Sequence, residues 1–343
     1  MTERVLTQRE LNRALLARQL LLERGRMSIP KGLERIGGIQ AQYAPAMYVG
    51  LWSRLEGFER AALTRALERR SVIQATMMRS TIHLVSKADY WPLMAGIRAS
   101  RRAWWERVHP KADPKQMKTA ARKLRRFLVD RPRRAKEVEQ HLGREQALGI
   151  GAYVDLVRVP PSGTWEQRRA DLYGLSEDWV GPDEADPDAG LELLVRRYLG
   201  GFGPASRTDI ADFAGVAITT VKPVLERMQL RRFQDENGKE LLDLPRAPLP
   251  DPDTPAPPRF LPVWDATLLV HARRTQILPE EHRSKVFHVK TPHSVNTFLI
   301  DGQVAGTWRF EGRKIELSPF DTIPRKERRA LDDEAKRLAA FHS

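Results

Sequence analysis

The chain has 343 residues, of which 58 are Lys or Arg and 44 are Asp or Glu, so its formal net charge at pH 7 is +14. Hydrophobic residues make up 41%, which is typical of globular proteins and argues against wholesale disorder. The lack of cysteine excludes disulfides, thiolate metal sites and a cysteine nucleophile. No apolar run is long enough to predict a membrane-spanning helix or a signal peptide. We expect a cytoplasmic protein of several domains whose charge favours a polyanionic partner.

The first 90 residues carry a succession of helix signals followed by a hairpin signal. Thr7 and Glu10 form a capping box that opens a helix, and Gly25 is the expected stop. The following elements are expected to be helices from Pro30, over 47–55 and over 61–70, then strands over 72–77 and 81–85. Helices followed by a hairpin are the order of a winged helix–turn–helix, so residues 1–90 are predicted to form a first unit of that kind.

The positive charge is concentrated in the next part of the chain. Between Arg98 and Lys136 there are fifteen Lys or Arg and only three acids, which gives this segment a net charge of +12. Trp104, Trp105 and Phe127 are interleaved with the cations, a pattern that favours contacts with nucleic-acid phosphates over a solvated helix face. Such a face can follow a DNA backbone in a salt-dependent way without reading its sequence.

The second unit is expected over residues 91–188 and repeats the order of helices and hairpin. A short helix over 133–142 stops at Gly143, and strands over 154–159 and 171–174 are predicted to pair. The stretch 177–192 holds seven acids and no Lys or Arg, and its Gly-Pro and Asp-Pro pairs indicate a loop or linker.

The third unit, over residues 189–245, gives the clearest pattern. Helices are predicted over 207–213 and 219–228, separated by a turn at Gly215. Strands over 230–234 and 240–244 are joined through Asn-Gly, which is a strong hairpin signal. The repetition is one of architecture, since no literal sequence repeat is visible.

Residues 246–262 are predicted to be a connector, followed by a β-rich module over 263–343. Eight prolines within 245–262 indicate an extended, semi-rigid strap. The module is expected to contain strands over 285–290, 295–300, 303–310 and 314–317, turns at 301–302 and 311–312, and a helix from Pro324. The predicted fold class is therefore α+β and mainly α, with tandem winged helix–turn–helix units and a small C-terminal β-rich module.

Motifs of nucleotide-binding and zinc-dependent enzymes are missing from the sequence. The glycine-rich stretch 200–204 is interpreted as the turn before the third helix–turn–helix and not as a phosphate cradle. The eight histidines are scattered, and His288 and His293 are too weakly spaced to argue for a metal. We predict neither a metal nor a cofactor.

The unusual segment is 37–45, which reads Gly-Gly-Ile-Gln-Ala-Gln-Tyr-Ala-Pro. Its two glycines disfavour a helix by roughly 1 kcal/mol each, and Pro45 disfavours helical backbone at Ala44. Gln40 and Gln42 would diverge on a helix but point the same way on an extended segment. The segment can therefore bring two neutral amides together, although from periodicity alone two such glutamines are usually ordinary surface residues.

Gln40-Ala41-Gln42 is similar to the Gln–aliphatic–Gln catalytic motif of the winged helix–turn–helix DNA glycosylase family typified by AlkZ. Relatives of the YcaQ type carry Asp at the last position of that motif. Other stretches resemble the same family, in the family's order and over most of the chain; they are 78–85, 261–265 with 268–271, and 301–309. The Gln motif alone is weak, whereas the set is fairly specific.

This resemblance implies a monofunctional DNA glycosylase with a concave basic surface. Its substrate would be double-stranded DNA carrying bulky N7-alkylated purines, in some members including interstrand crosslinks, in repair or in self-resistance to alkylating natural products. Gln40 and Gln42 carry over as the catalytic pair, and Thr81 and His83 lie in a matching segment where we give them an assisting role. Gln42 in place of Asp favours the AlkZ-like branch and puts in doubt a mechanism that needs a strong general base.

Glutamines suit this chemistry because an N7-alkylated purine is cationic and already a good leaving group. The enzyme then has to place water near C1′ and stabilise an oxocarbenium-like sugar. A Gln carbonyl can orient the water, and its amide can donate to a sugar or phosphate oxygen. Either base flipping or capture of the lesion within the duplex is compatible with the sequence.

Candidate DNA contacts come from the basic segment and from arginine pairs near the expected helix starts and wings. They are Arg98, Arg101, Arg102, Lys118, Arg122, Arg126, Arg133, Arg134, Arg168 and Arg169. Two other functions remain open: a non-catalytic winged-helix transcriptional regulator and a protein that sequesters adducts without cutting. We expect a monomer that acts on DNA without membrane contact.

Overall fold

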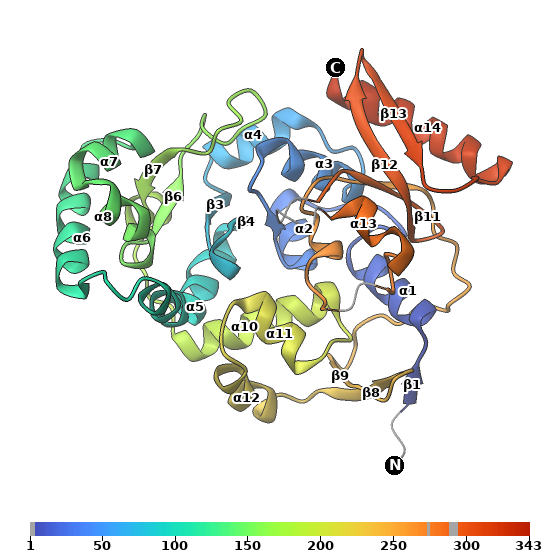
Figure 1. Cartoon of the computed structure of the whole chain (residues 1–343), viewed down its shortest axis with the longest axis horizontal. Coiled ribbons are helices and arrows are strands. Elements are labelled where there is room, and N and C mark those ends of the chain that lie inside the picture. Colours follow the sequence, from blue (N-terminus) through green and yellow to red (C-terminus); the bar gives the residue numbers. More distant parts are fainter. Residues whose placement is uncertain (1–3, 273–274, 288–293) are drawn as a thin grey trace.

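The computed structural model describes residues 4–272, 275–287 and 294–343 (Figure 1). About half of these residues are helical, and the strands form a three-stranded, a four-stranded and a six-stranded sheet. The predicted α+β, mainly α class is confirmed. Among the described residues, no helix has the length and apolar character needed to cross a membrane.

One succession of elements occurs three times. Each repeat has a helix, a very short strand, two helices and an antiparallel hairpin whose second strand also pairs with the short strand. We interpret the repeats as winged helix–turn–helix units because three helices with a two-stranded wing define that motif. The first repeat (29–86) consists of α2 (Ile29–Ile36), β2 (Ile39–Gln40), α3 (Ala44–Arg54), α4 (Arg60–Glu68), β3 (Val72–Thr76) and β4 (Ile82–Ser86).

The second and third repeats follow the same plan. The second (114–175) consists of α6 (Pro114–Leu128), β5 (Arg133–Arg134), α7 (Ala135–Leu142), α8 (Arg144–Gly149), β6 (Leu156–Arg158) and β7 (Leu172–Leu175). The third (187–243) consists of α10 (Pro187–Phe202), a bridge at Ala205, α11 (Arg207–Ala214), α12 (Ile218–Arg227), β8 (Arg231–Asp235) and β9 (Glu240–Asp243).

The first and second repeats share the six-stranded sheet, in the order β2-β4-β3-β6-β7-β5. They meet where β3 pairs antiparallel with β6, in the register Gln74 with Arg158 and Ala75 with Val157. The sheet therefore crosses the boundary expected near residue 90. In Figure 1 the helices α6, α7 and α8 flank the far end of this sheet, away from the C-terminal module.

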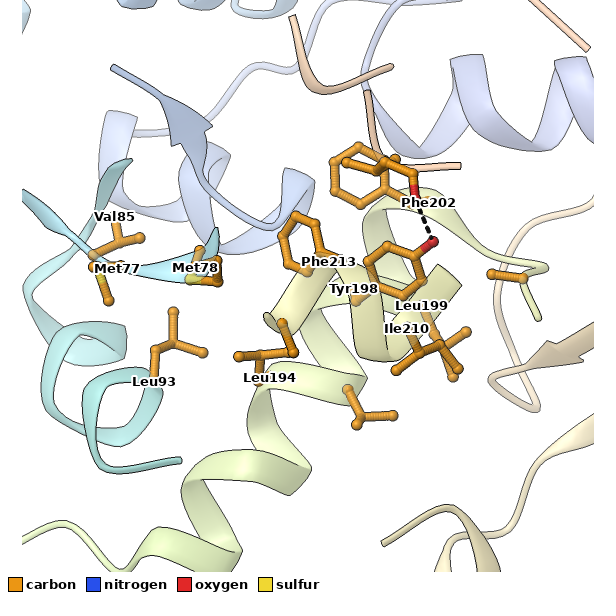
Figure 2. Close-up of a cluster of buried hydrophobic side chains, with 14 of the residues drawn as sticks. Met77, Met78, Val85, Leu93, Leu194, Tyr198, Leu199, Phe202, Ile210 and Phe213 are labelled. Atoms are coloured by element: carbon orange, nitrogen blue, oxygen red, sulfur yellow. Dashed lines mark hydrogen bonds between the residues drawn. The ribbon is translucent and has the colours of Figure 1, made fainter. Parts of the chain in front are cut away.

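A core joins the wing of the first repeat to the helices of the third. Helix α5 (Lys87–Val108) leaves β4 and packs along α10. Figure 2 shows Met77 and Met78 from the first hairpin near Leu93 of α5, with Tyr198 of α10 and Phe213 of α11 in the same cluster. The two methionines at the turn of this hairpin thus pack in the same core as the helices of the third repeat.

The chain termini and the proline-rich strap close the molecule. Strand β1 (Arg4–Leu6) pairs in parallel with β8, and α1 (Gln8–Arg18) follows with the predicted Thr7–Glu10 capping box. Arg18 and Arg13 of α1 donate to the carbonyls of Pro248 and Thr254, so the proline-rich stretch contacts α1. The C-terminal module contains β10 (Arg259–Leu261), β11 (Thr297–Ile300), β12 (Gln303–Glu311), β13 (Lys314–Pro319) and α14 (Arg325–His342). The turn at 301–302 lies where it was expected, whereas the second turn occupies 312–313 and not 311–312, because Glu311 pairs with Lys314. The short helices are α9 (Ser176–Val180), α13 (Arg283–Val286) and one-turn segments at 78–80, 150–152, 266–268 and 280–282.

Three local predictions were wrong. Helix α1 ends at Arg18 and not at Gly25, because Leu20 adopts left-handed backbone (φ 58°) and turns the chain. The strand expected over 285–290 is a helical turn at its start, and residues 288–290 lie outside the described part of the chain.

The third wrong prediction concerns the acidic stretch 177–192, which was expected to be a loop or linker. It is helical at both ends, since α9 occupies its first residues and α10 begins at Pro187. The Asp186 side chain accepts a hydrogen bond from the backbone N–H of Ala189, so this acid caps a helix.

Two element starts also differ from expectation. Helix α3 begins at Ala44, three residues earlier than predicted, because Pro45 occupies the first turn, where its missing N–H costs nothing. The helix expected from Arg133 begins at Ala135, since Arg133 and Arg134 pair with β7.

Candidate active site

The Gln-Ala-Gln motif lies on the short strand of the first repeat. Gly37 and Gly38, with φ of 79° and 81°, end α2 and turn the chain into β2. Gln40 then pairs with His83 of β4, and the Ala41 N–H donates to the Ile82 carbonyl over 2.7 Å. The extended backbone predicted for Gln40 is confirmed, and its cause is pairing with the wing.

Both glutamine carbonyls are held by donors of the β3–β4 hairpin. Gln40 is 9% exposed, and its Oε1 accepts from Nη2 of Arg79 over 3.3 Å. Gln42 is exposed, and its Oε1 accepts from the backbone N–H of Ile82 over 3.0 Å. An amide carbonyl has two lone pairs, so each group retains one acceptor position and its NH2 donors for another partner.

Arg79 orients Gln40 from a strained turn at the hairpin tip. Its φ is 51°, its Nη1 donates to the Phe213 carbonyl, and its guanidinium carbon lies 5.1 Å from the centre of the Phe213 ring. Gly215 lies directly against this turn, since a Cβ there would come within 2.8 Å of the Arg79 nitrogen. Burial lowers the pKa of Arg79. Contacts with the C-terminal end of α11 therefore fix the position of Arg79, which contacts Gln40.

His83 is a buried neutral base at this site. It is 2% exposed, and burial, reinforced by the nearby Arg79 cation, lowers its pKa to about 3. Its Nδ1 lies 3.0 Å from the Thr81 carbonyl, so the neutral ring donates there and presents Nε2 as an acceptor. Thr81 is half-buried, and its hydroxyl lies 3.1 Å from the Met78 carbonyl. Gln40 and His83 thus lie on β2 and β4, Thr81 directly precedes β4, and Gln42 lies two residues beyond β2.

A loop after the strap packs beside Gln40. A cavity of about 10 Å³ is lined by Gln40 together with Trp264 and Asp265. Asp265 forms a buried two-fold ion pair with Arg54 of α3, with N–O distances of 2.8 and 2.9 Å. Trp264 has left-handed backbone (φ 57°), which is uncommon for a bulky residue. The stretch 261–265, singled out from the sequence, is therefore brought to the motif.

Several of the residues predicted to contact DNA interact with other side chains of the protein. Arg98 forms ion pairs with two carboxylates, and Arg101 is 8% exposed. The guanidinium carbons of Arg102 and Arg133 lie 4.9 and 4.3 Å from the ring centres of Tyr153 and Phe127, respectively. Arg101 is buried and the other three side chains are partly buried, so these four present less exposed charge than the cations of α6.

The exposed cations lie on α6 and on the wing of the second repeat. Lys118, Arg122 and Arg126 occupy the outer face of α6 at helical spacing, opposite an apolar face that packs inward. Arg134 and Arg169 are exposed and share Asp171 as an ion-pair partner. Arg168 is also exposed, and it donates to the Tyr43 hydroxyl over 3.2 Å. Because Tyr43 follows Gln42, this wing reaches the candidate site.

Sequence reasoning assigned no role to Arg79, Trp264 or Tyr43. Arg79 and Trp264 lie in stretches that resemble the family, which was the available signal, and their left-handed backbone could not be inferred from composition. Tyr43 carries no local signal. No group of His, Asp or Glu able to hold a metal occurs within 4–272, 275–287 and 294–343, and His288 and His293 fall outside these ranges.

The chain thus combines three helix-and-hairpin repeats, a basic outer helix and a site in which two glutamine amides lie near a neutral histidine. A family model described as AlkZ-like DNA glycosylase matches residues 33–341. The chain therefore belongs to the AlkZ-like DNA glycosylase family, and it is an enzyme of that class. The resemblance inferred from the sequence is confirmed.

Individual relatives agree with this family. An interstrand DNA cross-link repair glycosylase of Streptomyces sahachiroi is 23% identical over 349 residues, which cover 94% of this chain and 93% of the relative. The solved structure of the Streptomyces sahachiroi DNA glycosylase AlkZ matches the fold with a TM-score of 0.81 at 20% identity, over 98% of this chain and 97% of that one.

Proposed function

We propose that this glycosylase releases bulky N7-alkylated purines from double-stranded DNA and unhooks interstrand crosslinks, as a monomer in the cytoplasm. The substrate class is supported by the relative named as a cross-link repair glycosylase. The observation that carries the proposal is the pair of amides at Gln40 and Gln42, each fixed by a hairpin donor while retaining free hydrogen-bonding capacity. Its biological role would be repair or self-resistance to alkylating natural products.

The proposed chemistry is positioning without a charged base. The alkylated purine leaves as a neutral base, so the protein has to hold a water near C1′ and stabilise the developing positive charge of the sugar. The free lone pair of Gln40 or Gln42 would orient that water, and Nε2 of His83 supplies a further neutral acceptor. The Arg79 guanidinium keeps Gln40 in place and is a positioning residue.

We further propose that the lesion is captured within the duplex. The cavity lined by Gln40 holds about 10 Å³, far less than a purine needs. Gln42, by contrast, is exposed beside Tyr43 and Arg168 on the outside of the wing. A bulky adduct can approach the exposed Gln42 more easily than it could enter a closed base pocket.

DNA binding is assigned to the exposed cations Lys118, Arg122 and Arg126 and to the wing arginines Arg134, Arg168 and Arg169. All six are exposed. Phosphate contacts of this kind supply salt-dependent affinity and set the register of the protein on the duplex.

A base-release assay tests the reaction. The full-length protein is incubated with duplexes that carry one N7-methylguanine, one bulky N7 adduct or one N7–N7 crosslink, and free base and abasic sites are quantified. Release from the bulky adduct, and separation of the crosslinked strands, are expected. Binding of all three duplexes without release would instead identify an adduct-sequestering protein, and selective binding of one undamaged sequence would identify a regulator.

A further inference from the structure

A second cavity lies at the open end of the shared sheet, between α5 and the helices α7 and α8. It has a volume of about 530 Å³, which lies within the range of small-molecule sites. Thr76 and Ser80 of the first hairpin line one side of it, and Arg158 and Tyr173 of the second repeat line another. The proposed reaction uses none of these residues.

Two buried guanidinium groups line this cavity without a carboxylate partner. Arg101 and Arg158 are each 8% exposed, and neither forms an ion pair within 4.0 Å with a described carboxylate; Asp155 acts on Arg101 and Asp171 on Arg158 only from farther away. Arg158 donates to the Thr76 hydroxyl over 3.0 Å and lies 4.2 Å from the centre of the Tyr173 ring. The Nε of each arginine has no hydrogen-bond partner among the described residues. Burying cations in this way is unfavourable unless a counter-charge compensates.

The remaining lining suits a nucleotide. Trp104 is 43% exposed and Trp105 is buried with an unpartnered Nε1, so an accessible indole lies near the cations. Exposed aromatic rings beside arginines are the usual platform for an unstacked base and its phosphate. Glu139 is the one carboxylate among the lining residues, and it is exposed.

The cavity lies a short distance across the sheet from the glutamine pair. Ile82 donates to Gln42 and pairs with Thr76, which lines the cavity. Neighbouring strands are about 4.8 Å apart, so Gln42 and Thr76 are separated by about 10 Å. At about 3.4 Å per base-pair step this separation corresponds to roughly three steps along a duplex.

We propose that this cavity receives an unstacked nucleotide of the bound DNA about three positions from the lesion, with its phosphate facing Arg101 and Arg158 and its base against Trp104. The inference rests on the proposed action on duplex DNA. The cationic lesion itself is a poor occupant, because two unpaired buried cations repel an N7-alkylated purine. The unmodified nucleotides of the strand carry the negative charge that the cavity lacks.

The test uses a duplex with a stable abasic-site analogue and 2-aminopurine placed in turn one to five positions from it. The wild-type protein is expected to change the fluorescence at a position near three and to leave the others nearly unaltered. Arg158→Met and Trp104→Ala are expected to abolish that change and to weaken binding about tenfold. Arg70→Met removes the same charge from a similar ring contact outside the cavity, and Phe310→Ala removes an exposed ring elsewhere, so both controls should behave as wild type.

Thermal unfolding separates a binding role from a structural one. Arg158→Met removes an unpaired buried charge, so its Tm should equal or exceed that of the wild type. A lower Tm together with unaltered DNA binding would make Arg158 structural and overturn the proposal. So would the absence of any position-specific fluorescence change, or a loss of binding limited to bulky-adduct DNA. Since this readout is binding, inactivity in the base-release assay would refute the proposed function and leave the cavity assignment standing.

Discussion

The first and second repeats have one topology and share one sheet, yet their side chains are used in opposite ways. In the first repeat, buried neutral groups gather along β2 and β4, with Gln40 and His83 nearly inaccessible. In the second repeat, helix α6 presents Lys118, Arg122 and Arg126 to solvent. A winged helical unit can thus become a reaction site or a phosphate-binding surface, and burial of its edge strand decides which.

The contrast has an electrostatic reason. Burial penalises charge, so His83 stays neutral and Arg79 has a lowered pKa at the first repeat. The α6 cations are exposed, which costs nothing and lets them attract phosphates. In the proposed reaction, this separation would keep a strongly basic surface away from the site at which a positively charged sugar is stabilised.

The largest effect is expected from Gln40→Ala combined with Gln42→Ala. The double variant should lose at least a thousandfold in single-turnover base release, because both water-orienting groups are gone. Its affinity for the damaged duplex should stay within about threefold, as measured by fluorescence anisotropy. If affinity fell together with activity, the first repeat would also contribute to DNA binding.

The reciprocal change replaces Lys118, Arg122 and Arg126 by Ala. Affinity should fall about 10- to 100-fold, and the slope of log Kd against log salt should decrease by about 3, since each phosphate contact contributes about 0.9. Release rates at saturating protein should change little. Replacing Arg325, Lys326 and Arg329 of α14 removes equal charge and should leave binding unaltered. If the two triple variants weakened DNA binding equally, the contribution of α6 to affinity would come from net charge alone and not from the position of its cations.

A smaller effect concerns pH. His83 has a pKa of about 3 when folded and about 6.5 when unfolded, so below pH 6.5 the unfolded chain binds a proton that the folded chain does not. Stability attributable to His83 is complete above pH 6.5 and falls as pH drops toward 3, by about 2 kcal/mol at pH 5.

Urea unfolding at pH 7 and pH 5 measures this. His83→Gln should lose about 2 kcal/mol less than the wild type over that interval. Between pH 7 and pH 8 the two proteins should run parallel. Identical losses down to pH 5 would mean that the first repeat accommodates a charged imidazole.

The smallest effect is expected from Gly215→Ala in the third repeat. The added Cβ meets the backbone of Arg79 at a positive φ, so the variant should lose about 1 kcal/mol of stability and about tenfold in release rate. Gly238→Ala is the matched control, because it has a similar φ of 75° and nothing within 4 Å. If both variants kept full activity, the support of the hairpin by α11 would be irrelevant to catalysis.

Much of the scaffold could be predicted because its signals are local. The Thr7–Glu10 capping box, the Asn-Gly hairpin between β8 and β9 and the turn at 301–302 each depend on a few adjacent residues. Features that depend on contacts between distant parts of the chain could not be predicted from the sequence. Leu20 ends α1 early by adopting a left-handed backbone that no neighbouring residue signals.

The same division applies to the site. Gln40 and Gln42 were found through a motif, whereas Arg79 acquires its role from α11, more than 130 residues away. The charge run from Arg98 to Lys136 does not indicate which of its side chains are exposed. Arg98 forms ion pairs with Asp155 and Asp183, which come from later parts of the chain. Arg101 is buried by tertiary packing, which cannot be deduced from a count of charges.

The pairing of β3 with β6 has a mechanical consequence. Because the sheet is continuous from β2 to β5, helix α6, which is proposed to bind DNA, and the strand that carries Gln40 are held in a fixed position relative to each other. The offset along the duplex between the gripped phosphates and the cleaved bond is set by strand spacing and not by a flexible linker. Every lesion should therefore be approached from the same side with the same footprint length, whatever the size of its adduct.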